Sequence, residues 1–301
     1  MTTATTSGLT EPDTDGPRPP ASRTLPTWTW LLPPLAGLSF ALLYPLFLVL
    51  RESVSPETGG YSLEVYRETF GSSAFQEALW TTVWIALAAT TGCMVLGFFL
   101  SLVLAFVPFP GSRLVARFID IFLAFPSFLI ALSLVFIYGS AGMANGLWTD
   151  LTGAREGPVD FLTTPWGVIM AEITFFTPFV MRPLLAAFSQ VDTAQLEVAS
   201  SLGARPLRVI RTVILPEVLP SLAAGGALVL VLCLNDFGIV LFTGAKDVVT
   251  LPLLIYTRAI LEYDYPGACV VAVVNVTLSI SLYGLYRVAM SRTAGDSRAR
   301  S

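Results

Sequence analysis

Two acidic residues, Glu172 and Asp236, stand in stretches of sequence that are otherwise almost wholly apolar. Because an ionisable group is costly inside a bilayer, such residues indicate a functional site. We predict that Glu172 and Asp236, with the neighbouring Asn235, line a polar path, where carboxylates would attract an amine-bearing solute. The alternative is a structural role, either a hydrogen bond between helices or a pair with Arg182 or Asn275.

Asp120 is expected to have a different role. It follows Arg117 by three residues, near the end of an apolar stretch. Residues three apart lie on the same face of a helix and can pair there. We therefore expect a local ion pair between Asp120 and Arg117 at the membrane interface, without a part in transport.

The sequence offers no catalytic, metal or cofactor site. It contains no His, and Cys93, Cys233 and Cys269 fall in apolar stretches, where a thiol behaves as a small apolar group. We therefore expect neither a zinc site nor a disulfide framework, and no hydrolase triad. The single lysine, Lys246, stands in Gly-Ala-Lys-Asp, which is not a phosphate-binding loop. If ATP drives this protein, a separate polypeptide must bind it.

The composition is that of an integral membrane protein. Of 301 residues, 54% are hydrophobic and 13% charged, and the mean hydropathy is +0.72. A membrane-spanning helix needs about 20 apolar residues. Six stretches meet that length, which predicts an all-α protein with six transmembrane helices, at residues 27–50, 79–107, 114–138, 165–188, 218–243 and 267–290.

The distribution of basic residues predicts the orientation. Most of the 17 Lys and Arg residues fall in alternate loops and near the two ends of the chain, and cytoplasmic loops carry such an excess. Both termini, and the segment between the fourth and fifth spans, are then cytoplasmic, in a cell membrane. Residues 1–26 read as a disordered tail without a signal peptide, residues 27–290 as the transmembrane domain and residues 291–301 as a second tail.

The segment between the fourth and fifth spans is polar and carries local helix signals. Asp192 is a helix-capping residue with Gln195 three positions on, as in a capping box. Gly203 fits a helix end, and Pro206 fits the first turn of the next helix. We predict a helix, a turn and a second helix, which could dock on a partner.

The sequence from Glu197 to Pro216 resembles a motif of permease subunits of type I ABC importers, E-A-A-x3-G-x9-I-x-L-P. Val198 and Val213 depart from it by apolar changes. The resemblance implies a cytoplasmic coupling helix that contacts the ATPase. The coupling residues it implies are Glu197, Ala199, Ser200, Leu202, Gly203, Ala204, Leu215 and Pro216.

The resemblance also implies partners. A permease of this kind works with a dimer of ABC ATPase subunits, a second permease subunit and an extracytoplasmic solute-binding protein, in a lipid bilayer and without nucleic acid. We favour a related chain over an identical copy as the second permease. No cofactor is expected on this chain.

Four further segments are similar to permeases of 2-aminoethylphosphonate importers. They begin at Phe136, Val159, Ala171 and Asn235. That cargo is therefore expected, and polyamines, ferric iron, thiamine and sulfate are the alternatives within the same branch. An ion-coupled secondary transporter using the two buried acids would leave the docking segment unexplained. A membrane scaffold without a pathway would require the polar groups inside the spans to be purely structural.

Several smaller features bear on the helices. Residues 61–79 read as an amphipathic helix started by Ser62. Pro126, Pro178 and Pro183 should bend or interrupt spans. Gly225 and Gly226 should allow two helices to pack closely.

Overall fold

The computed structural model describes residues 31–55, 60–159 and 161–298 as helices and loops, without a strand in those ranges. Within them, six segments are long and apolar enough to cross a membrane, which confirms the all-α prediction. The α-helices are α1 (Leu32–Ser53), α2 (Glu64–Gly71), α3 (Ser73–Phe106), α4 (Ser112–Phe122), α5 (Ser127–Tyr138), α6 (Met143–Thr152), α7 (Pro165–Phe188), α8 (Thr193–Ser201), α9 (Pro206–Val209), α10 (Leu215–Leu234), α11 (Gly238–Thr243), α12 (Leu251–Tyr256) and α13 (Tyr265–Arg298).

The chain divides into two compact units, residues 1–47 and 48–301. In the first unit, the described residues are the beginning of α1, whose side chains are exposed. The predicted N-terminal tail, residues 1–26, lies outside the described residues. In the second unit, α13 continues to Arg298 and so includes most of the segment assigned to a C-terminal tail.

The third predicted span, residues 114–138, is wrong as a single helix. Helix α4 ends at Phe122, and α5 begins at Ser127 after Pro126, whose backbone is extended. Proline lacks an N–H and forces the residue before it out of the helical region, so the helix stops although the apolar run continues. The third membrane-length segment is instead α5 with α6, residues 127–152. Pro178 and Pro183, in contrast, lie within a continuous α7.

Two other predicted helices are also divided. The fifth predicted span, residues 218–243, ends at Leu234, and a short break separates α10 from α11. The predicted amphipathic helix at residues 61–79 is split at Ser72 into α2 and the beginning of α3. Its start is as expected, since the Ser62 hydroxyl accepts the N–H of Glu64 at 3.0 Å.

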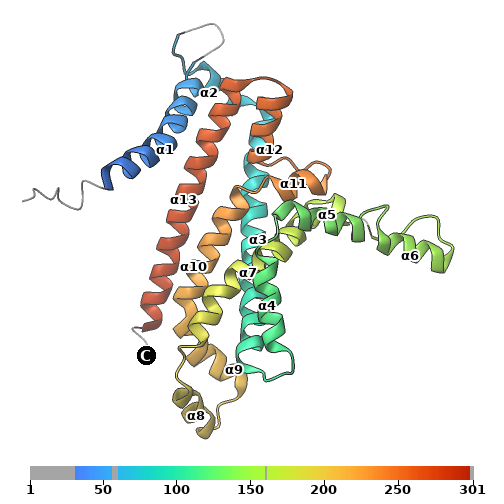
Figure 1. Cartoon of the computed structure of the whole chain (residues 1–301), viewed down its shortest axis with the longest axis vertical. Coiled ribbons are helices and arrows are strands. Elements are labelled where there is room, and N and C mark those ends of the chain that lie inside the picture. Colours follow the sequence, from blue (N-terminus) through green and yellow to red (C-terminus); the bar gives the residue numbers. More distant parts are fainter. Residues whose placement is uncertain (1–30, 56–59, 160, 299–301) are drawn as a thin grey trace, which may run out of the picture. The chain divides into compact units, whose positions relative to one another are not determined.

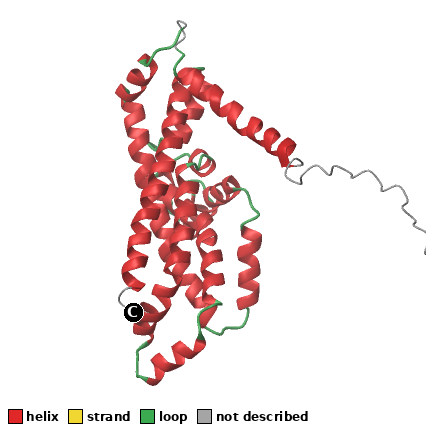
Figure 2. Cartoon of the chain, turned by 90° about the vertical axis from the view of Figure 1, so that its left-hand side faces the viewer, coloured by secondary structure: helices red, strands yellow, loops and turns green. Residues whose placement is uncertain are grey.

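The core of the second unit is a junction of three helices, α3, α7 and α10, which pack against one another and lie close together in Figure 1. Figure 2 shows that helices connected by loops make up the described residues. Val180 of α7 is fully buried between glycines of the other two helices. A Cβ atom on Gly97 of α3 would lie 3.1 Å from the Val180 side chain, and one on Gly225 of α10 would lie 3.1 Å from the Val180 Cα. Small residues let helix backbones approach closely, so the predicted packing role of Gly225 is confirmed.

Candidate functional site

The polar segment after α7 folds as the helix, turn and helix that its sequence predicts. We call residues 192–209, which hold α8 and α9, the docking element. The Asp192 carboxylate accepts the N–H of Ala194 at 2.9 Å and so caps α8, while Gln195 donates its backbone N–H to the Asp192 carbonyl at 3.1 Å. The predicted cap at Asp192 is confirmed.

Gly203 ends α8 with a left-handed backbone, φ +75°. The N–H of Ala204 bonds the Ala199 carbonyl at 3.1 Å, and the N–H of Gly203 bonds the Ser200 carbonyl at 2.9 Å. These two bonds form a Schellman motif, which satisfies carbonyls at the helix end. A Cβ atom on Gly203 would meet nothing within 4 Å. Glycine is therefore favoured here by its backbone conformation and not by lack of space.

The docking element presents apolar side chains to solvent. Leu202 is 82% exposed and Leu207 is 76% exposed, on either side of the turn. Figure 1 shows α8 and α9 beyond the ends of α7 and α10, away from the three-helix core. Large apolar side chains exposed together in a polar segment are typical of a surface that binds another protein.

Apolar contacts seat the docking element on the bundle. A groove of about 360 Å³ lies between the end of α3, with Phe106, and the inner face of the element, with Leu196, Ala204 and Val209. Leu196 and Val209 pack against the core cluster. The sequence motif singles out neither residue, and the one signal for either was that it is apolar.

Six of the eight predicted coupling residues lie together in the docking element, and two do not. Leu215 and Pro216 begin α10, after a π-helical turn at Ile210–Ile214. Both are half-buried, and Leu215 packs against the core cluster. The motif therefore joins an exposed surface to the helix that carries it into the bundle.

The three predicted path residues have contacts inside the bundle. Glu172 is 1% exposed, and its Oε2 atom has no hydrogen-bond partner among the described residues. Asp236 is 8% exposed and accepts the N–H of Ile239 at 2.9 Å. Asn235 is exposed, and its side chain accepts a bond from Asn275 at 3.1 Å, which is the kind of hydrogen bond between helices that the structural alternative expects. A role of all three in a path stays a prediction.

The expected ion pair between Asp120 and Arg117 is wrong. The Asp120 carboxylate of α4 pairs instead with the Arg182 guanidinium of α7 at 2.7 Å. Within the structural alternative for the buried acids, the option of a pair with Arg182 is therefore wrong too. Although Arg117 lies one turn away on the same helix, the packing of α4 beside α7 places the Arg182 guanidinium against the Asp120 carboxylate. Both paired side chains remain about half exposed, at 53% for Asp120 and 54% for Arg182.

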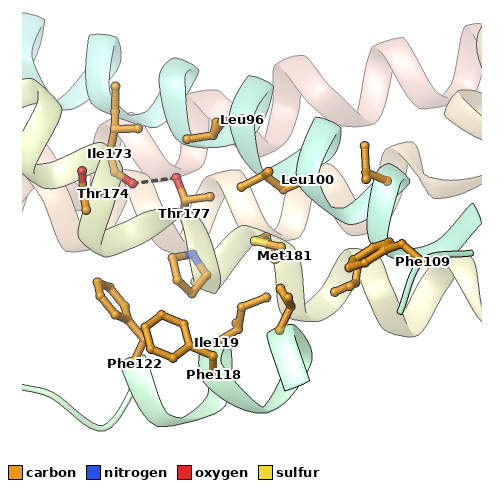
Figure 3. Close-up of a pocket in the computed structure, with 14 residues that line it drawn as sticks. Leu96, Leu100, Phe109, Phe118, Ile119, Phe122, Ile173, Thr174, Thr177 and Met181 are labelled. Carbon is orange, nitrogen blue, oxygen red and sulfur yellow. Dashed lines mark hydrogen bonds between the residues drawn. The ribbon is translucent and has the colours of Figure 1, made fainter. Parts of the chain in front are cut away.

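An apolar groove of about 390 Å³ lies beside this ion pair, between α3, α4 and α7. Figure 3 shows Phe118, Ile119 and Phe122 of α4 on one side, and Ile173 and Met181 of α7 across from them. Ile119 and Met181 are the sequence neighbours of the paired Asp120 and Arg182. The ion pair between Asp120 and Arg182 thus holds α4 to α7, and the apolar groove next to it is not completely filled by side chains.

Comparisons with known proteins agree with this architecture. Residues 94–294 match the family described as "Binding-protein-dependent transport system inner membrane component". A protein of Salmonella typhimurium, provisionally named the 2-aminoethylphosphonate transport system permease protein PhnU, is 53% identical over 264 residues, which cover 88% of this chain and 92% of the relative. A permease protein of Chlorokybus atmophyticus, provisionally named for a sulfate transport system, is 30% identical over 269 residues, covering 87% of each chain.

Solved structures share the fold. A chain of a bacterial alginate ABC transporter, solved in complex with a periplasmic protein carrying an alginate pentasaccharide, matches with a TM-score of 0.76 at 18% identity, over 89% of this chain and 94% of that one. A chain of the MetNI methionine ABC transporter, in an inward-facing conformation, matches with a TM-score of 0.52 at 21% identity, over 74% and 96%. The chain described here belongs to the family of inner-membrane components of binding-protein-dependent transport systems, and it is a multi-pass permease subunit of an ABC importer and not itself an enzyme.

Proposed function

We propose that this chain forms half of the translocation pathway of an importer for 2-aminoethylphosphonate. The observation that carries the proposal is the 53% identity to the Salmonella permease over 88% of this chain. This cargo has an anionic phosphonate and a cationic ammonium, and charged groups do not enter hydrocarbon without a large desolvation cost. A protein pathway is therefore needed to move it across a membrane.

The docking element is proposed to couple this chain to a separate dimer of ATPase subunits. The exposed Leu202 and Leu207 give it an apolar surface, and the Asp192 cap and the Gly203 turn hold α8 in a fixed conformation. A short helix with an exposed apolar face is suited to insertion into a groove of a partner. Closure of the ATPases on ATP would then move α8, and α8 would move the bundle.

The proposed orientation places the docking element and both termini in the cytoplasm. It is supported by the excess of Arg in these segments, among them Arg205, Arg208 and Arg211 next to the docking turn. An ATPase that uses cytoplasmic ATP must meet the permease on that side. The orientation and the docking function therefore support each other.

Two further partners complete the proposed assembly. A second permease subunit would supply the other half of the pathway, and we favour a related chain over an identical copy. A solute-binding protein would deliver the cargo from outside, in keeping with the binding-protein-dependent family. The complex would open alternately to the outside and the inside.

The proposal is tested by uptake of radiolabelled 2-aminoethylphosphonate in cells that lack this chain and carry it back on a plasmid. Wild type should restore uptake, and excess unlabelled spermidine, ferric iron, thiamine or sulfate should not compete. If the aminophosphonate is not taken up, and radiolabelled spermidine, ferric iron, thiamine or sulfate is taken up instead, the cargo assignment is wrong while the permease assignment stands.

The coupling role is tested in the same cells with Leu202→Asp and Gly203→Asp. Both place a charge on the docking surface, so uptake should be lost while the membrane level of the protein stays normal. Leu202→Met is the matched control, because it keeps the side chain apolar and should keep uptake. Normal uptake by the two Asp variants would disprove the docking role.

A further inference from the structure

The ion pair between Asp120 and Arg182 is unusual in its exposure. Arg182 is the only basic residue of α7, and it lies six residues before the end of that helix at Phe188. Both paired side chains are about half exposed although the helices around them are apolar. Exposed charges facing hydrocarbon are strongly unfavourable. Because this subunit forms half of a pathway, we infer that the surface with Asp120 and Arg182 faces the water-filled path.

The local charge suits an anionic ligand that also has one positive group. Arg117 precedes Asp120 by one helical turn on α4 and is exposed. The surface thus combines two guanidinium groups, of Arg117 and Arg182, with one carboxylate, of Asp120. A phosphonate is attracted by the excess positive charge, and an ammonium group on the same molecule is attracted by the carboxylate.

Helix α4 is built so that the ion pair can open. It begins after Gly111, which has a left-handed backbone with φ +97°, and it ends before the break at Pro126. The apolar groove of about 390 Å³ separates part of α4 from α3 and α7, as Figure 3 shows. A movement of α4 into this groove would separate Asp120 from Arg182.

We propose that Asp120 and Arg182 form a cargo site in the pathway, in which Arg182 binds the phosphonate and Asp120 binds the ammonium of a zwitterionic aminophosphonate. This inference rests on the proposed function, and it assigns to α4 and α7 the recognition of both charged ends of the cargo. Glu172 and Asp236 are less suited to this role, because both are buried and neither forms an ion pair within the described residues.

Binding at this site is an exchange of ion pairs. In the free protein, Asp120 and Arg182 neutralise each other; when cargo enters, each pairs with the opposite charge on the cargo. The guanidinium can donate two parallel N–H bonds to phosphonate oxygens, a geometry that favours arginine over lysine. An exposed ion pair is weak because water competes for both partners, so separating the two side chains costs little free energy. No covalent bond is made or broken.

The test measures binding to the complete transporter, with its ATPase and second permease subunit, in nanodiscs without nucleotide and without the solute-binding protein. The two probes are radiolabelled 2-aminoethylphosphonate and radiolabelled ethylphosphonate, which lacks the ammonium. Wild type should bind the aminophosphonate more tightly. Arg182→Gln should lower the affinity for both probes by about tenfold or more, which is the loss expected when a charge-assisted hydrogen bond is removed. Asp120→Asn should lower the affinity for the aminophosphonate only, so that the protein no longer prefers the aminophosphonate to ethylphosphonate.

Matched variants separate a cargo site from a structural ion pair. Arg155→Gln and Asp150→Asn neutralise exposed charges outside α4 and α7 and should bind both probes as wild type does. Arg182→Lys keeps the charge but loses the paired donors, so it should bind both probes at an intermediate level. If Asp120→Asn lowers the affinity for both probes equally, or if the Asp120 and Arg182 variants bind as wild type does, the cargo site is disproved.

Failure of this inference can be told apart from failure of the proposed function. Uptake of 2-aminoethylphosphonate by cells with the wild-type transporter is measured first. No uptake would refute the proposed cargo itself. Normal wild-type uptake together with no binding of either probe to the nanodisc complex would refute the cargo site alone.

Discussion

The three-helix core around Val180 and the docking element use apolar residues in opposite ways. In the core, Val180 is fully buried, and Gly97 and Gly225 bring the neighbouring backbones against it. In the docking element, Leu202 and Leu207 are among the most exposed large apolar side chains of the described chain. Apolar character alone therefore does not distinguish a residue that stabilises the fold from one that forms a surface for binding another protein.

Glycine shows the same contrast. Gly225 is needed because a side chain would strike the Val180 backbone, whereas Gly203 has open space and is favoured by its positive φ. Substitution in the core should therefore reduce the amount of folded protein, and substitution in the docking element should reduce coupling while the protein remains folded. The predictions below test this separation.

The largest effect is expected for Gly225→Leu. The new Cβ would lie 3.1 Å from the Val180 Cα, which cannot move without shifting α7. Overpacking of this kind costs about 1–3 kcal/mol or more. We expect a lower thermal unfolding temperature in detergent and a reduced membrane level. Gly284→Leu is the matched control, since a Cβ there meets nothing within 4 Å; equal loss in the two variants would contradict the packing argument.

The next effect is expected for Gly203→Val. A β-branched residue is poorly tolerated at a left-handed position, where an L-residue pays about 1–2 kcal/mol. The turn should shift, so that uptake falls strongly while thermal stability of the isolated permease stays near wild type. Gly203→Asn should be milder, because Asn adopts this conformation more readily. Equal uptake by the Val and Asn variants would show that the backbone conformation is not what coupling requires.

A smaller effect is expected for Asp192→Ala. The variant removes the cap of α8, a loss of about 1 kcal/mol in helix stability. The membrane level should be unchanged, and uptake and transport-linked ATP hydrolysis should fall together by a moderate factor. Asp192→Ser should restore both, because Ser is a comparable cap. A variant with Ala that matches wild type would show that partner binding fixes α8 without the cap.

The smallest effect is expected for Asp236→Asn. Asn can accept the N–H of Ile239 as Asp does, so the start of α11 should be kept. Because Asp236 is buried, we expect uptake to change less than in the three variants above. A large loss of uptake with normal assembly and ATPase activity would instead support the prediction that Asp236, with Glu172 and Asn235, lines the path.

Local signals in the sequence were sufficient for the docking element. The Asp192 cap, the Gly203 turn and Pro206 at the start of α9 act within a few residues of the chain, and all three appear as predicted. Within the described residues, the number of membrane-length helices was also correct, because hydropathy averaged over a whole span depends little on single residues. The extent of the third span was not: Pro126 was expected to bend or interrupt a span, but the sequence alone did not show which of the two it would do.

The sequence by itself determined the membrane class, the motif and the local shape of the docking element, because these depend on composition and on neighbouring residues. Only the tertiary structure decided which distant residues meet. It joined Asp120 to Arg182 where the sequence favoured Arg117, joined Asn235 to Asn275, and placed Val180 against Gly97 and Gly225. These pairings depend on how whole helices pack, and packing is set by the sum of many weak contacts that no short stretch of sequence contains.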